Sequence, residues 1–168
     1  SAMARFCKNF KRLSHGAQSR LTVENDDKAS MFSVVDLYHG VYKVIGIPIV
    51  FDYHHHQFCT GDLTEKAALH LASKTWPKSI KQCVHYSESR RREQSLVVKN
   101  FIAKNNILME NISEYPTMEN LYKESQKIRV QAHSDYIVDP INTWGFPLDI
   151  MVEAKAKELT VQEYTNII

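Results

Sequence analysis

The sequence has little of several features that define other protein classes. Its three cysteines, Cys7, Cys59 and Cys83, are too few and too irregularly spaced for a disulfide framework or a C-x-x-C zinc motif. This favours an intracellular, reducing compartment, in the cytoplasm or nucleus. No apolar run approaches the roughly 18 residues that cross a membrane, and no secretory signal pattern is present, so we expect no membrane association.

The net charge and the composition are those of an ordinary globular protein and indicate no extreme class. The net charge of +2 permits a polyanionic partner without requiring one. With 43% hydrophobic and 24% charged residues, the chain has the composition of an ordinary globular protein. Its 168 residues can bury a substantial core. We therefore expect a single domain spanning residues 1–168.

Hydrophobic periodicity predicts helices and strands in alternation. Ser33 is suited to begin a helix that Gly46 ends, and Gly16 is suited to end an earlier helix. Residues 86–132 break the alternation, with one ordered element expected at about 117–132. The predicted helices cover residues 4–18, 33–45, 61–75 and 151–166, and the predicted strands cover residues 20–24, 47–52, 80–85 and 148–153. This order predicts an α/β fold of parallel βα units.

Four strands leave two architectures open. A closed (β/α)₈ barrel needs eight strands and typically ~250 residues. The chain is therefore either an open four-stranded α/β sheet or part, about half, of a TIM-type barrel.

Each predicted strand ends on a residue that can bind a metal. These residues are Glu24, Asp52, His85 and Glu153. Because the carboxyl ends of parallel strands meet at one edge of a sheet, carboxylates and imidazoles gather there. Such a set suits zinc, manganese or iron and favours metal-assisted hydrolysis.

The individual motifs also have simpler explanations. Glu24 is followed by Asn25-Asp26-Asp27, which could be only a turn, although a carboxylate that ends an apolar strand is costly without a partner. A turn after Tyr53 would let Asp52 and His55 converge. His54 and His56 could support a ligand or contact a DNA phosphate, and a lone His85 could be structural.

Five strings, in order, resemble the UV-damage endonuclease family: RLTVENDDK, GIPIVFDYHHH, VHYSESR, AHSDYI and DIMVEAKAKE. The resemblance covers about residues 4 to 160. It implies part of a (β/α)₈ barrel that binds up to three divalent metals, manganese or zinc. It also implies a DNA repair endonuclease that incises damaged double-stranded DNA on the 5′ side of UV photoproducts.

The resemblance assigns roles residue by residue. Glu24, Asp52, His85 and Glu153 resemble catalytic metal ligands, and His55 and His133 resemble ligands of a third metal. Arg90, Arg91, His54 and Tyr86 are candidates for contacts with DNA. The family often has a lysine where this chain has Cys83, and about four preceding strands of the barrel are absent.

Two other functions remain open on the sequence alone. The same ligands would serve a metal-dependent sugar isomerase-like or phosphoesterase-like barrel. An isolated half-barrel could instead be a non-catalytic binding or assembly module. Because a half-barrel exposes its sheet, we expect a homodimer or a missing N-terminal half, and little or no lesion-directed activity from this chain alone.

Overall fold

The computed structural model describes residues 1–165, which divide into two compact units. The first unit contains Ser1–Tyr86 and Ile141–Met151, and the second contains Ser87–Pro140 and the chain from Val152 on. In the described range, no helix has both the length and the apolar character that a membrane crossing demands. Each unit is described by itself below.

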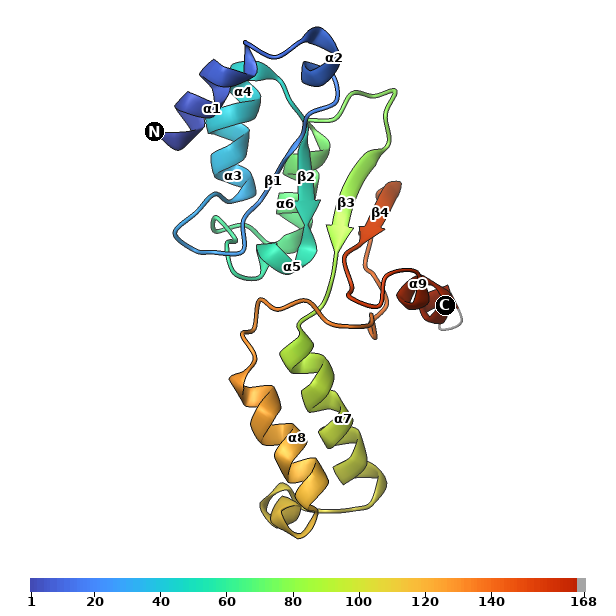
Figure 1. The fold of residues 1–168 in the computed structure, drawn as a ribbon. Coiled ribbons are helices and arrows are strands. Elements are labelled where there is room, and N and C mark those ends of the chain that lie inside the picture. The colour runs from blue at the N-terminus through green and yellow to red at the C-terminus, as the bar shows by residue number, and fades with distance from the viewer. Residues whose placement is uncertain (166–168) are drawn as a thin grey trace. The chain divides into compact units, whose positions relative to one another are not determined.

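The first unit is built on a sheet of four strands in the order β1-β2-β3-β4. Parallel pairs join β1 to β2 and β2 to β3, and Figure 1 shows β4 running in the same direction as β3. The strands are β1 (Val23–Glu24), β2 (Ile49–Asp52), β3 (Gln82–Tyr86) and β4 (Leu148–Val152). The predicted α/β fold with a parallel sheet is confirmed, although the strands are shorter than predicted.

Helices cover one face of this sheet and form the core with it. Every residue of β2 is buried, as its continuous apolar run predicts. Ile49 and Phe51 pack in one cluster with apolar residues of α3 and α6. The helices of this unit are α1 (Ala2–Phe10), α2 (His15–Gln18), α3 (Val34–Leu37), the π-helical turn η1 (Tyr38–Tyr42), α4 (Lys43–Ile45), α5 (Tyr53–His56) and α6 (Glu65–Ser73).

Two predicted helix boundaries, the start at Ser33 and the end at Gly46, are confirmed. Ser33 begins α3 in a capping box with Asp36, in which each side chain accepts a hydrogen bond from the other residue's main-chain N–H. Gly46 ends α4 with a φ of 76°. The prediction of one helix over residues 4–18 is wrong. Ser14 caps a second helical turn, which contains Gly16.

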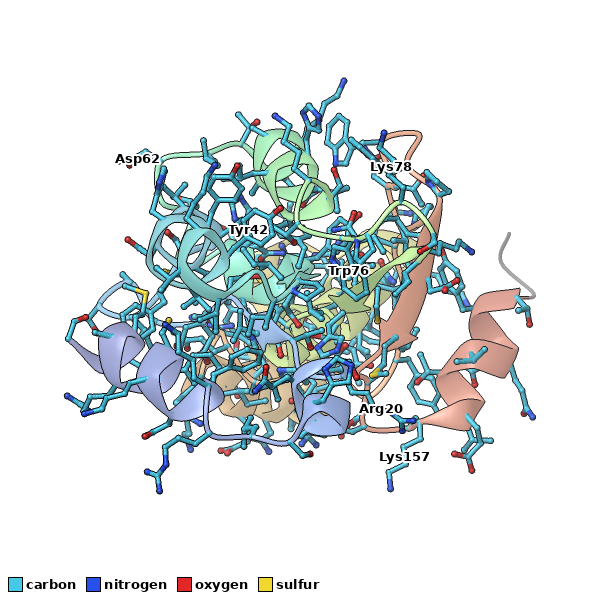
Figure 2. The ribbon with its side chains drawn as sticks, turned by 90° about the horizontal axis from the view of Figure 1, so that it is seen from above. Arg20, Tyr42, Asp62, Trp76, Lys78 and Lys157 are labelled. Atoms are coloured by element: carbon cyan, nitrogen blue, oxygen red, sulfur yellow. The ribbon has the colours of Figure 1, made fainter. Side chains whose placement is uncertain are left out.

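The amino-terminal end of β2 is tied down by two side chains that follow α6. The Thr75 hydroxyl accepts a hydrogen bond from the Ile49 N–H at 2.9 Å. The Trp76 indole donates one to the Ile49 carbonyl at 2.7 Å. Figure 2, seen from above relative to Figure 1, looks onto this end of β2 and labels Trp76. The amino-terminal end of β2 is therefore fixed by hydrogen bonds with the Thr75 and Trp76 side chains.

The second unit contains a helical hairpin that was not predicted as such. Figure 1 shows α7 (Arg90–Lys104) and α8 (Pro116–Lys127) side by side, joined through the 3₁₀ turn η2 (Met109–Glu114). The remaining helix is α9 (Glu158–Thr165). An antiparallel bridge between Ser89 and His133 joins the two ends of the hairpin segment.

Candidate metal centre

Three strand ends of the first unit bring their side chains together. Glu24 ends β1, Asp52 ends β2, and His85 lies directly opposite Asp52 in β3. One ligand atom from each of these residues lies within 4.8 Å of those of the other two. The cluster follows from parallel strands in register, since the carboxyl ends then share an edge.

Asp52 also begins the next helix, and this brings His55 to the cluster. The Asp52 carboxylate accepts a hydrogen bond from the His55 main-chain N–H at 2.7 Å and caps α5. The helical turn places His55 Nδ1 3.1 Å from Glu24 Oε1 and 4.0 Å from Asp52 Oδ1. The turn expected after Tyr53 therefore starts one residue earlier and has the expected effect.

Glu24 is the centre of this charge arrangement. His85 Nδ1 lies 3.3 Å from Glu24 Oε2, so the carboxylate has an imidazole at each oxygen. Burial acts to raise the pKa of Glu24, but hydrogen bonds and charge interactions with His55 and His85 outweigh it and lower the pKa to about 2. Burial acts to lower the pKa of His55, yet Glu24 and Asp52 raise it to about 9. Glu24 and His55 therefore form a charged pair over a wide range of pH.

The donor set of this cluster fits a divalent metal. Two carboxylates and two imidazoles combine hard oxygen with borderline nitrogen ligands, as zinc and manganese sites do. The Asp52 side chain is fully buried, and a buried carboxylate needs a cation or strong hydrogen-bond donors. Cys83 stands two residues before His85, but burial and the charge of Asp149 raise the pKa of its thiol, so it adds no thiolate at neutral pH.

His133 and Glu153 lie together in the second unit. His133 Nδ1 is 3.0 Å from the Glu153 carbonyl oxygen and 3.9 Å from its carboxylate. A carbonyl oxygen only accepts hydrogen bonds, so Nδ1 donates to it, and in the neutral ring Nε2 has the lone pair that can bind a metal. Glu153 comes one residue after β4, as the strand-end pattern predicts.

Two carboxylates, the buried Glu88 and the half-buried Glu93, hold the segment that carries His133. Glu88 Oε1 accepts hydrogen bonds from the main-chain N–H groups of Val138 and Asp139 at 3.2 and 2.9 Å. Glu93 accepts from the N–H groups of residues 135 and 136 at 2.9 and 2.8 Å. Sequence reasoning missed both glutamates, because their partners lie more than 40 positions further along the chain.

The residues predicted to contact DNA have different environments. His54 is fully buried, with its ring 5.2 Å from that of Phe58, so it offers no exposed imidazole to a phosphate and we do not carry that assignment forward. Tyr86 is half-buried against Tyr53, at 5.4 Å between ring centres.

The arginines at the start of α7 are engaged within the second unit. Arg90 Nη2 lies 3.7 Å from Asp135, and Arg91 Nη2 donates to Gln126 at 2.5 Å. Arg92 pairs with Glu88 and Asp139. A DNA contact by Arg90 or Arg91 therefore requires exchange of these partners, and it stays a prediction.

Comparison with known proteins agrees with the resemblance noted in the sequence. The model of a family described as UV-endonuclease UvdE matches residues 1–166. The UV-damage endonuclease of Schizosaccharomyces pombe is 33% identical over 170 residues, which cover 95% of this chain and 22% of that protein. The UV DNA damage endonuclease of Bacillus velezensis is 30% identical over 160 residues, covering 94% and 41%.

A solved structure shares the fold. The crystal structure of SacUVDE matches with a TM-score of 0.63 at 24% sequence identity, over 99% of this chain and 47% of that one. The chain thus spans less than half the length of each of these three relatives. From the match of the family model over nearly all its residues, the chain belongs to the UV-endonuclease UvdE family.

Proposed function

We propose that this chain carries metal ligands of a DNA repair endonuclease that incises the backbone 5′ to UV photoproducts. The observation that carries the proposal is the convergence of Glu24, Asp52 and His85 within 4.8 Å at one edge of the sheet. The names of the relatives, UV-damage endonuclease and UV DNA damage endonuclease, support UV-damaged DNA as the substrate. The metal is manganese or zinc, and the DNA substrate is double-stranded and damaged.

Different residues of the cluster have different roles in binding the metal. When bound, a divalent metal supplies positive charge against phosphate oxygens and lowers the pKa of water toward neutrality. Glu24 and Asp52 supply the negative charge that retains the ion, and His85 adds a nitrogen ligand. His55 presents Nε2, because its Nδ1 is directed at the Asn25 carbonyl and Glu24. We propose that Glu153 is also a metal ligand, and that His133 is a ligand of a further metal.

Metal binding tests the proposal most directly. After treatment with a chelator, the protein is titrated with Mn²⁺ in a calorimeter. We expect Asp52→Asn to weaken binding by about 100-fold or more, because it removes a charged ligand. The matched control is Asp149→Asn, which alters an exposed carboxylate of β4 that pairs with Lys81 at 2.7 Å. Equal affinities in the wild type and Asp52→Asn contradict the proposed site.

Incision of UV-irradiated duplex tests the activity of this chain alone. Because the chain spans less than half of its relatives, we expect little or no incision with added Mn²⁺. Efficient incision that Glu24→Gln abolishes would show that the chain is sufficient for catalysis. A homodimer stays a prediction, and sedimentation of the purified protein at tens of micromolar decides it.

A further inference from the structure

Asn25, the residue after β1, has an unusual set of hydrogen bonds. It is only 1% exposed, and a buried amide side chain needs partners for both its donor and its acceptor. Its Nδ2 donates to the Asp52 carbonyl oxygen at 3.0 Å, and its Oδ1 accepts from the Asp52 N–H at 2.9 Å. One side chain thus satisfies both main-chain polar groups of one metal-ligand candidate.

This pairing begins where the main-chain ladder stops. In the ladder between β1 and β2, Glu24 is the last residue, and it pairs with Val50. On the other side of β2, Asp52 still pairs with His85 of β3. The Asn25 amide therefore takes the place of a peptide group beside Asp52. It fixes the orientation of the peptide planes on either side of the Asp52 carboxylate.

Asn25 also contacts a second residue of the cluster. Its main-chain carbonyl oxygen lies 2.9 Å from His55 Nδ1, which in the neutral ring keeps the proton on Nδ1 and leaves Nε2 available to a metal. Asn25 is bonded covalently to Glu24 as well. Its side chain, main chain and peptide bond thus connect to three residues of the proposed centre.

We propose that Asn25 is a positioning residue of the metal centre, holding Glu24, Asp52 and His55 in the arrangement that a divalent cation requires. This inference rests on the proposed function. The competing explanation is that Asn25 only completes the sheet edge and contributes to stability alone. The two explanations differ in one measurable quantity, the metal affinity of the folded protein.

Two variants separate these explanations. Asn25→Ala removes both hydrogen bonds to the carboxyl-terminal residue of β2. The matched control is Thr75→Val, which removes a buried side-chain hydrogen bond to the N–H of Ile49 at the opposite end of the same strand. For each chelator-treated protein, urea unfolding gives the stability, calorimetry gives the Mn²⁺ affinity, and melting with and without Mn²⁺ gives the stabilisation by metal.

Both variants should lower the stability, but only one should weaken metal binding. We expect Asn25→Ala to lower the Mn²⁺ affinity by about 10- to 100-fold, the usual effect of removing a group that orients a ligand. Thr75→Val should leave the affinity within about twofold of the wild type. Wild-type affinity in a cooperatively folded Asn25→Ala protein would overturn the inference.

A second variant keeps the test decisive if Asn25→Ala does not fold. Asn25→Ser retains a hydroxyl and is subject to the same criterion. Weakened Mn²⁺ binding supports the inference, and wild-type binding overturns it. A wild-type protein that binds no Mn²⁺ contradicts the proposed function, and the inference falls with it. If the wild-type protein binds Mn²⁺ and the Asn25 variants bind it equally tightly, the result contradicts this inference but not the proposed function.

Discussion

The charge interaction between Glu24 and His55 should make the stability of the metal-free protein depend on pH. The pKa of His55 rises from 6.5 to about 9 on folding, and that of Glu24 falls from 4.5 to about 2. A group whose pKa is raised on folding stabilises the folded protein at pH values below its unfolded-state pKa. This stabilisation is lost as the pH rises through the folded-state pKa. A lowered pKa stabilises above the unfolded value, and this stability is lost as the pH falls. The pair therefore contributes fully between about pH 4.5 and 6.5.

The size of the effect follows from the same values. Each pH unit by which a pKa moves corresponds to about 1.4 kcal/mol, so the His55 change corresponds to about 3 kcal/mol. The Glu24 change reports largely the same interaction and is not added. Because 31% of the Glu24 side chain is exposed, water screens the pair, and we expect about 1–2 kcal/mol.

Urea unfolding at pH 6 and pH 9.5, in the presence of a chelator, measures this contribution. Wild-type stability should fall between the two pH values by about 1–2 kcal/mol more than that of Glu24→Gln. Comparing the two proteins removes the effect of every other group that titrates in this range. An equal fall in the wild type and Glu24→Gln would refute the reasoning, since the partner of His55 would then not be Glu24.

Three further outcomes are expected. Mn²⁺ affinity should fall as the pH drops below about 9, by up to about tenfold per pH unit, because a proton on His55 competes with the ion; calorimetry over pH 6–9 measures it. Gly61→Ala should cost about 1–3 kcal/mol in urea unfolding, because Gly61 has a φ of 57° and an added Cβ would lie 2.4 Å from the Ser33 hydroxyl oxygen. Glu88→Ala should speed hydrogen exchange at the amides of residues 138–139, which Glu88 holds, and NMR measures those rates; unchanged rates would contradict the described bonds.

The strand ends were predictable from the sequence, and the supporting residues were not. Glu24, Asp52 and His85 each end or nearly end an apolar run, and the parallel register brings such positions together. Asn25 directly follows Glu24 in the sequence, but a polar residue after a strand usually indicates a turn. Its partner, Asp52, is 27 positions away, so only the fold reveals their pairing.

The helical hairpin was missed for a different physical reason. An amphipathic helix shows its apolar residues on one face, and α7 does not. Val98 is buried while the adjacent Val97 is 51% exposed, so neighbouring apolar residues in the sequence have opposite environments. Its pairing with α8, rather than a marked periodicity of its own, accounts for the helix.

The bridge between Ser89 and His133 has a consequence for how this part of the chain can vary. The hairpin segment leaves and returns at one point, so its length is independent of the positions of its two ends. A change in the length of this segment alters the free-energy cost of closing the loop only slightly, by about 0.6 kcal/mol per doubling of length. The part of the hairpin beyond Glu93 can therefore differ in length. A shorter or longer excursion there would leave Glu88 and Glu93 in place, and these two residues hold the segment that carries His133.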